Sequence, residues 1–504
     1  MLYPKKSHVS LILFLFLTLT LMSQPSKLIT KRIVDANTGK ALPYANIYNP
    51  RTQSGVISNE DGYFKLDLNN LDKFDSIRFQ YVGYLTINIA INDFIKLNTV
   101  KLKGRIVDIS EMVVYAEAPN AKAIVKKVLE NKDKNYKKSI NKEKVFIRSR
   151  QTTNMIDKDI NFVKSDIPKL NSVLIEKLNA SIPKVATSFS DFLGVTYRNE
   201  FLPDSISFKL NPIRTVVLKE KDITELDELE KIFEDAIKKM GKDEYWKFKT
   251  GIISQKVDMT DTAQSTKKKD SIPKNHRKVK YYSRSVKRKK NFSMLNDKRQ
   301  WHFLHKPGKY KFTTVGGTSV NGEDVYVIDF VPGMGGLYEG RLFISTTTYA
   351  LIKADYKYAE GKDGISFNMF GIAFKELGFS ASIYFVKKGD DYQLKYYSKK
   401  MNNYFKFDRT VSLIKKRDRF MFDPKQNEMK LGIKFSANSE DLLEYMVIED
   451  NTISEATFNK AVQPDLMKIH YVDQFNDRLW EGYDIIEPTR QMRRYKKHKD
   501  PTLN

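Results

Sequence analysis

Two histidines lie close enough in the sequence to be considered as ligands of one metal ion. His302 and His305 fall in the segment 301–305, whose Trp301 and Phe303 favour a β-strand. Residues three apart on a strand point to opposite faces, and no acidic residue neighbours these histidines. We therefore predict no metal site, and nothing else in the sequence indicates a cofactor.

Signatures of covalent and nucleotide chemistry are missing from the sequence. Gly-Lys pairs begin at Gly39, Gly241 and Gly361, but none has the spacing of a phosphate-binding loop, and there is no Gly-x-Ser-x-Gly segment. The chain has no cysteine, which excludes a thiol nucleophile and disulfides. These observations predict a protein that is not an enzyme. A glycan hydrolase stays open as an alternative, because the spacing of a catalytic carboxylate pair is spatial.

Residues Asn59, Asp61 and Gly62 share part of the pattern of a calcium-binding loop. The first and twelfth ligand positions would be Ile57 and Leu68, and neither can supply a carboxylate. We interpret the segment as a β-turn that precedes an alternating strand.

The N-terminus has the features of a secretory signal peptide. Lys5 and Lys6 precede an uncharged apolar run over 9–22, which is followed by Ser23. We expect 1–23 to be removed and the mature chain to have no transmembrane span, since no later segment is comparably apolar. The alternative is an uncleaved N-terminal anchor.

The charge of the chain is strongly positive. Lys and Arg total 87 against 61 Asp and Glu, a formal net charge of +26. Such a field attracts anions. For an exported protein in the periplasm or at the outer membrane, the expected partners are envelope components (lipid, lipopolysaccharide, glycan or an outer-membrane protein) and not nucleic acid. Alternatively, the charge reflects the base composition of the genome.

Short β-branched and aromatic runs alternate with turn signals over 27–115, as in an antiparallel sandwich. In order, the chain contains Ile33-Val34-Asp35, Leu42-Pro43-Tyr44-Ala45-Asn46-Ile47, Asn59-Glu60-Asp61-Gly62-Tyr63-Phe64, Val82-Gly83-Tyr84 and Glu111-Met112-Val113-Val114. This series resembles the carboxypeptidase regulatory-like domain, a prealbumin-type β-sandwich of Gram-negative envelope proteins. The resemblance implies a seven-stranded-type sandwich with an accessory role. It implies no peptidase activity, because no zinc ligands accompany it.

The rest of the chain is expected to be α+β, with helices on one face of a large curved antiparallel sheet. Apolar spacing predicts helices over 121–129, around 170–174, and from Thr224 to Met240. In the last of these, Leu226, Leu229, Phe233, Ala236, Ile237 and Met240 should be buried. Strands are predicted over 310–315, 325–330, 341–345, 351–358, 365–370, 382–386 and 393–397. We predict an α+β domain over 119–435 and a C-terminal extension over 436–504 with a basic tail.

A second resemblance rests on three segments: Val320-Asn321-Gly322-Glu323-Asp324-Val325-Tyr326-Val327-Ile328-Asp329-Phe330, Gly340-Arg341-Leu342-Phe343-Ile344 and Thr348-Tyr349-Ala350-Leu351-Ile352-Lys353. Their strand pattern is similar to that of lipoprotein-carrier (LolA-like) folds. The helix over 121–129 stands where those folds place their first helix. The resemblance implies an unclosed sheet that holds acyl chains beneath helices.

A basic block over 267–290 should repel itself and stay an extended loop. Within it, a candidate polyanion patch comprises Lys278, Lys280, Arg284, Lys287 and Arg288. The alternative is a solvated insertion without a ligand.

Aromatic residues on the predicted strands form a candidate apolar ligand surface: Phe343, Tyr356, Tyr358, Phe367, Phe370, Tyr384 and Phe385. We expect the helix over 224–240 to cover it in part. The alternative is an ordinary filled core. The leading expectation is a non-catalytic envelope protein with a binding or assembly role, and a periplasmic lipid or lipoprotein carrier is the alternative.

Overall fold

The computed structural model describes residues 28–52, 55–69, 71–105, 120–218, 224–238, 243–251, 253–257, 272–320, 322–418, 424–483 and 485–495. The chain divides into two compact units. One comprises the described residues up to Tyr81 together with Leu85–Gly104, and the other comprises the remainder. The predicted signal peptide lies outside the described residues. Among those described, no helix is both long and apolar enough to cross a membrane.

The first unit is the expected seven-stranded sandwich. Its elements are β1 (Leu28–Asp35), β2 (Asn46–Tyr48), β3 (Gly55–Ile57), β4 (Tyr63–Asp67), β5 (Ser76–Gln80), β6 (Ile87–Ala90), α2 (Ile91–Lys96) and β7 (Thr99–Leu102). The strands form two small sheets, in the orders β4-β1-β7 and β3-β2-β5-β6. Phe64, Phe79 and Phe94 pack together between them, with ring centroids about 6 Å apart. The Asn59 side chain accepts the N–H groups of Asp61 and Tyr63, so the turn interpretation is correct.

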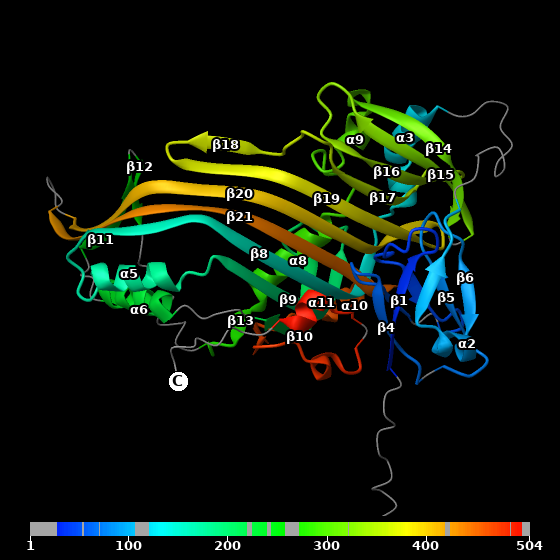
Figure 1. Cartoon of the computed structure of the whole chain (residues 1–504), viewed down its shortest axis with the longest axis horizontal. Helices are drawn as coiled ribbons and strands as arrows, with labels where there is room; N and C mark the ends of the chain where they lie inside the picture. The colour runs from blue at the N-terminus through cyan, green and yellow to red at the C-terminus, as the bar shows by residue number, and fades with distance from the viewer. Residues whose placement is uncertain are drawn as a thin grey trace, which may run out of the picture. The chain divides into compact units, whose positions relative to one another are not determined.

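The second unit is a 14-stranded, mainly antiparallel sheet with helices on it (Figure 1). Its strands are β8 (Ile140–Ser165), β9 (Val185–Asn199), β10 (Phe208–Leu218), β11 (Glu244–Thr250), β12 (Ile253–Val257), β14 (Tyr310–Val320), β15 (Glu323–Pro332), β16 (Tyr338–Ser345), β17 (Leu351–Tyr358), β18 (Ser366–Met369), β19 (Ile372–Lys388), β20 (Asp391–Arg417), β21 (Lys425–Thr452) and β23 (His470–Val472). A separate ladder pairs β13 (His276–Lys278) with β22 (Leu466–Lys468). The mainly β and α+β fold class is therefore confirmed.

Helical elements of this unit are α3 (Ala121–Glu130), α4 (Lys132–Asn135), α5 (Ser172–Ser181), α6 (Thr224–Lys238), α8 (Val279–Asn291), α9 (His302–His305), α10 (Glu455–Lys460), α11 (Arg490–Arg494) and the short 3-10 turns η2 (Pro307–Lys309) and η3 (Asp477–Trp480). The predicted division at residue 435 stays a prediction, and β21 runs across that position without a break.

Two secondary-structure predictions were wrong. The segment around His302 forms the short helix α9 instead of a strand, because Phe303 and Leu304 both turn into the core. Most of the described part of the basic block forms helix α8 instead of an extended loop. Burial of Val279 and Val286 stabilises this helix against the repulsion of its charges.

Helix α6 also differs from expectation. Leu226, predicted to be buried, is 46% exposed, while Ile232 is buried. The side chains of Ile237 and Met240 lie outside the described residues. The helix packs with α5 over Met429 and Leu431 of β21 and over Trp246 of β11. The prediction that this helix covers part of the strands over 310–397 was wrong. Its apolar partners lie at the other end of the long strands.

Candidate functional site

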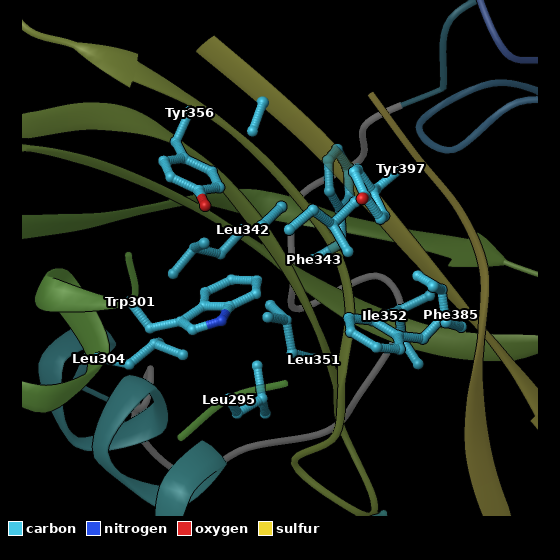
Figure 2. Close-up of a cluster of buried hydrophobic side chains, with 14 of the residues drawn as sticks. Leu295, Trp301, Leu304, Leu342, Phe343, Leu351, Ile352, Tyr356, Phe385 and Tyr397 are labelled. Carbon is cyan, nitrogen blue, oxygen red and sulfur yellow. The ribbon is translucent and has the colours of Figure 1, made fainter. Parts of the chain in front are cut away.

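Four of the seven predicted ligand-surface residues lie in a packed core. Phe343, Tyr356, Tyr358 and Phe385 belong to one hydrophobic cluster with residues of α3, α8 and α9. Figure 2 shows Trp301 packed among aliphatic and aromatic side chains there, and its ring centroid is 5.7 Å from that of Tyr356. Burial raises the pKa of the Tyr356 hydroxyl well above its usual value. This region is filled by the helices that lie on it.

The other three residues are placed differently. Tyr384 is half-buried at the margin of that cluster. Phe367 and Phe370 are 47% and 63% exposed on the hairpin formed by β18 and β19. The structure therefore separates the predicted surface into a core and an exposed part.

Of these exposed residues, Phe367 belongs to a row of five phenylalanines that crosses four strands. We call this row the aromatic strip, and it comprises Phe367 of β18, Phe374 of β19, Phe405 and Phe407 of β20, and Phe435 of β21. Phe374 pairs in register with Phe367 and with Phe405, and Phe407 pairs with Phe435. The corresponding ring centroids are 6.1, 5.1 and 5.9 Å apart. Cross-strand partners share a face of the sheet, so the rings form one continuous surface.

This surface lies on the face of the sheet that carries the helices. The pairing of β21 with β20 runs without a break from Met446 to Asn427, so alternate residues of β21 keep to one face. On that face, Met429 and Leu431 lie under α5 and α6, and Tyr445 lies in the cluster with α3 and α9. Phe435 falls between them. The strip thus lies between these two helix-covered regions. Figure 1 shows the helices of the two regions, α5 with α6 and α3 with α9, at opposite ends of the long strands.

Polar groups border the strip at both ends. Toward the cluster with α3, Asp441 accepts hydrogen bonds from Asn403 and from Ser439, at 3.4 and 3.3 Å. Toward α5, the ammonium group of Lys158 donates to the carbonyl oxygens of Asn179, at 2.6 Å, and of Ile182. These polar groups lie at the margins of the strip, and the rings between them present apolar carbon.

The opposite face of the same strands is charged. Ion pairs join Lys375 to Asp363 at 2.6 Å and Lys434 to Asp157 at 2.8 Å. An open pocket of about 420 Å³ also lies beside β17, β19 and β20, and its lining includes Lys357, Glu360, Lys362, Asp363, Lys400 and Asn402. The phenylalanines of the strip therefore lie on one face of these strands and the ion pairs on the other, as in an amphipathic sheet.

The two histidines have structural partners. The Nδ1 atom of His302 is 2.7 Å from the hydroxyl of Tyr310, and the Nε2 atom of His305 is 2.8 Å from the carbonyl of Leu295. Burial and nearby lysines lower the pKa of His302, which favours the neutral ring. Within the described residues, no group of three or more acidic or histidine side chains could hold a metal ion.

The candidate polyanion patch is only partly a single surface. Lys278, Lys280, Arg284 and Arg288 are exposed on or just before α8. Lys287 instead forms an ion pair with Asp204 at 2.6 Å. Phe374, Phe405, Phe407 and Phe435 were not among the predicted site residues, because β19 and β20 were predicted only in part and β21 was not predicted. The alternation of apolar and charged residues over 403–410 was the available signal.

Comparison with known protein families supports the first resemblance. Residues 29–114 match the family model of the CarboxypepD_reg-like domain. No curated protein sequence matches the chain. Among solved structures, an outer membrane lipoprotein-sorting protein domain from Vibrio parahaemolyticus matches at 8% identity and a TM-score of 0.20, over 68% of this chain and 98% of that one.

Two further solved structures match with similar identity, coverage and TM-score. A LolA superfamily protein from Nitrosomonas europaea matches at 9% identity and a TM-score of 0.17, over 68% of this chain and 99% of that one. A DUF1329 family protein from Desulfovibrio piger matches at 9% identity and a TM-score of 0.18, over 68% and 98%. TM-scores of this size are too low to support an argument about function.

Proposed function

We propose that this protein is an exported, non-catalytic protein of the Gram-negative cell envelope that binds the hydrocarbon chain of a lipid or lipid-linked ligand along the aromatic strip. The observation that supports this most directly is the strip itself. It is a row of rings in register, partly open to solvent, on a face that is otherwise covered by helices. Contiguous exposed apolar surface of this kind marks interaction sites in soluble proteins.

The chemistry of the strip favours an acyl chain over a polar ligand. Phenylalanine offers no hydrogen-bonding group, so the rings can contribute only apolar contact. The strip is also long and narrow, since it follows one row of cross-strand neighbours from β18 to β21. Export is supported by the basic head and apolar run over 5–22.

The test is a titration with dansyl-undecanoic acid, a fluorescent fatty acid. We expect saturable binding in the micromolar range, about 8 kcal/mol of binding free energy. The double variant Phe374→Ser, Phe405→Ser should weaken it at least tenfold, and excess phospholipid should displace the probe. Tyr404→Ser is the matched control, because Tyr404 precedes Phe405 in β20 and faces the other way.

Equal affinity of the wild type and the double variant would contradict the proposal. Loss of affinity in the Tyr404→Ser control as well would show that the probe reports general instability. A strip that binds no acyl probe but still captures an envelope protein would favour the assembly role.

A further inference from the structure

Helix α8 has one side packed on the sheet and one side open to solvent. Val279, Ser283 and Val286 are buried, and the ring of Tyr282 lies 5.0 Å from that of Phe192 in β9. The exposed side carries Lys280, Arg284 and Arg288 at successive intervals of four residues. Tyr281, next to Lys280, is 63% exposed. Intervals of four place these three cations in one stripe along the helix.

The cations of α8 differ in their partners. On the side toward the sheet, Lys287 pairs with Asp204 and Lys290 pairs with Glu143, both at 2.6 Å. Lys280, Arg284 and Arg288 make no ion pair with any acidic group in the described parts of the chain. The stripe therefore keeps its full positive charge.

Neighbouring strands extend the stripe into a patch. β13 precedes α8 and pairs with β22, which brings Lys278 opposite Leu466 and His276 opposite Lys468. Lys278, Lys468 and Leu466 are all exposed. We define the basic patch as Lys278, Lys280, Arg284, Arg288 and Lys468, with Tyr281 and Leu466 as its exposed apolar members.

Local energetics oppose this arrangement. Like charges at intervals of four destabilise a helix by about 0.2–0.5 kcal/mol per pair. Cations near a helix N-terminus are also unfavourable, and the first turn of α8 has no acidic residue and no side-chain cap. An anionic partner would remove both penalties, whereas solvent only screens them.

We propose that the basic patch docks this protein on a bilayer surface rich in anionic phospholipid. The cations would lie over the headgroups, while Tyr281 and Leu466 reach the boundary with the acyl chains. A mixture of cations with an exposed aromatic and an exposed aliphatic side chain fits such an interface better than a purely polar polyanion. This surface is separate from the aromatic strip, so the inference does not rest on the proposed function.

The test is sedimentation of the full chain with vesicles. We compare vesicles of phosphatidylcholine alone with vesicles that contain a third phosphatidylglycerol, at low and at physiological salt. The triple variant Lys280→Gln, Arg284→Gln, Arg288→Gln should bind the anionic vesicles at least thirtyfold more weakly. The control Lys122→Gln, Lys126→Gln, Lys134→Gln removes the same charge from exposed positions of α3 and α4 and should bind like the wild type. Tyr281→Ser should cost a further few-fold without changing the salt dependence.

Selective binding to anionic vesicles that is lost in the patch variant alone would support the inference. Binding that is equal for both lipid compositions, or equally weakened in both triple variants, would overturn it. So would binding to heparin or RNA without binding to vesicles. Because the mutated side chains are exposed, unchanged circular dichroism is expected. Should the triple variant misfold, Arg284→Gln alone and the salt titration of the wild type decide the outcome.

Discussion

Two regions on the same face of the long sheet use the same residue types with different results. Around Trp301, aromatic side chains from β14 to β17 are covered by α3 and α9 and are almost fully buried. Along the aromatic strip, Phe405 and Phe367 are 38% and 47% exposed. The long strands β19 and β20 run from the strip into the covered region, where they contribute Ile383 and Tyr397. The difference is the presence of a helix whose apolar side matches the surface.

This contrast shows why aromatic content alone does not identify a binding surface. In the covered region, the helix α3 brings Ile124, Val125 and Val128 onto the sheet, and α9 adds Phe303. A ring there contributes to the free energy of unfolding. A ring in the strip contributes less to stability and remains able to contact a ligand. Substitutions in the covered region should therefore affect stability more than substitutions in the strip.

The largest effect is expected for a charge placed under α3. Ile124 is buried, so Ile124→Asp should lower the free energy of unfolding by about 5 kcal/mol, since an unpaired carboxylate would be transferred into the core. Ala123→Asp introduces the same charge at the exposed neighbouring position and should change stability by less than about 0.5 kcal/mol. Denaturant unfolding of both variants measures the difference. Similar stability of the two would mean that α3 does not cover the sheet.

The next effect compares one ring in each region. Phe303 is fully buried and its ring stacks 4.4 Å from that of Phe330, so Phe303→Ala should cost about 3–5 kcal/mol. Phe405→Ala should cost about 1 kcal/mol or less, because the ring is already partly solvated. The same variant should bind the acyl probe more weakly. A cost at Phe405 as large as that at Phe303 would make the strip a core surface.

The half-buried carboxylate of Asp450, near the C-terminal end of β21, should make stability depend on pH. Burial, followed by the nearby charge of Glu143, raises the pKa of Asp450 to about 6. The folded state therefore binds this proton more tightly than the unfolded state, and the free energy of unfolding falls as the pH rises from about 4 through 6. Asp450→Asn removes this penalty. It should stabilise the protein by about 1 kcal/mol at pH 7.5, a value reduced for partial exposure, and by nothing at pH 4.

Glu449→Gln, at the exposed position next to Asp450, is the control for that measurement. A stabilisation by Asp450→Asn that is the same at both pH values would show that its charge is not the cause.

Much of the fold follows from local patterns in the sequence. The Asp61-Gly62 turn and the apolar spacing from Ala121 to Val128 each predict one element, because the signal lies within a few residues. The long strands β8 and β21 were missed. The middle residues of these strands lie beside polar residues of the neighbouring strands. For example, Asp441 of β21 accepts a hydrogen bond from Asn403 of β20. Alternation is weak where polar side chains occupy both faces.

The candidate sites were less predictable than the fold for a related reason. The strip joins Phe367 to Phe435 across four strands, and its unity depends on register, which no local pattern encodes. Likewise, Lys468 joins the basic patch through the pairing of β13 with β22, almost two hundred residues apart. Conversely, α8 is a helix although its positive charges repel one another, and that repulsion was the reason for predicting a loop. Strand pairing decided the first two cases, and burial of Val279 and Val286 decided the third.

The smallest expected effect concerns the turn at the exposed end of the strip. Phe370 and Gly371 connect β18 to β19 and have φ angles of 50° and 77°. This is the left-handed region, where Asn and Gly are favoured and an aromatic residue is strained. Phe370→Asn should therefore raise the free energy of unfolding by about 0.5–1 kcal/mol. The same change should weaken binding of dansyl-undecanoic acid, because it removes an exposed ring from the hairpin that carries Phe367. Phe370→Leu is the control, since it keeps both the strain and the apolar surface, and it should leave stability and binding nearly unchanged.

A loss of stability in Phe370→Asn would show that the Phe370 ring is packed in solution, and the turn would then belong with the covered region. A gain in stability with a loss of binding would show that the turn next to the strip retains an aromatic residue for binding, at a cost in stability.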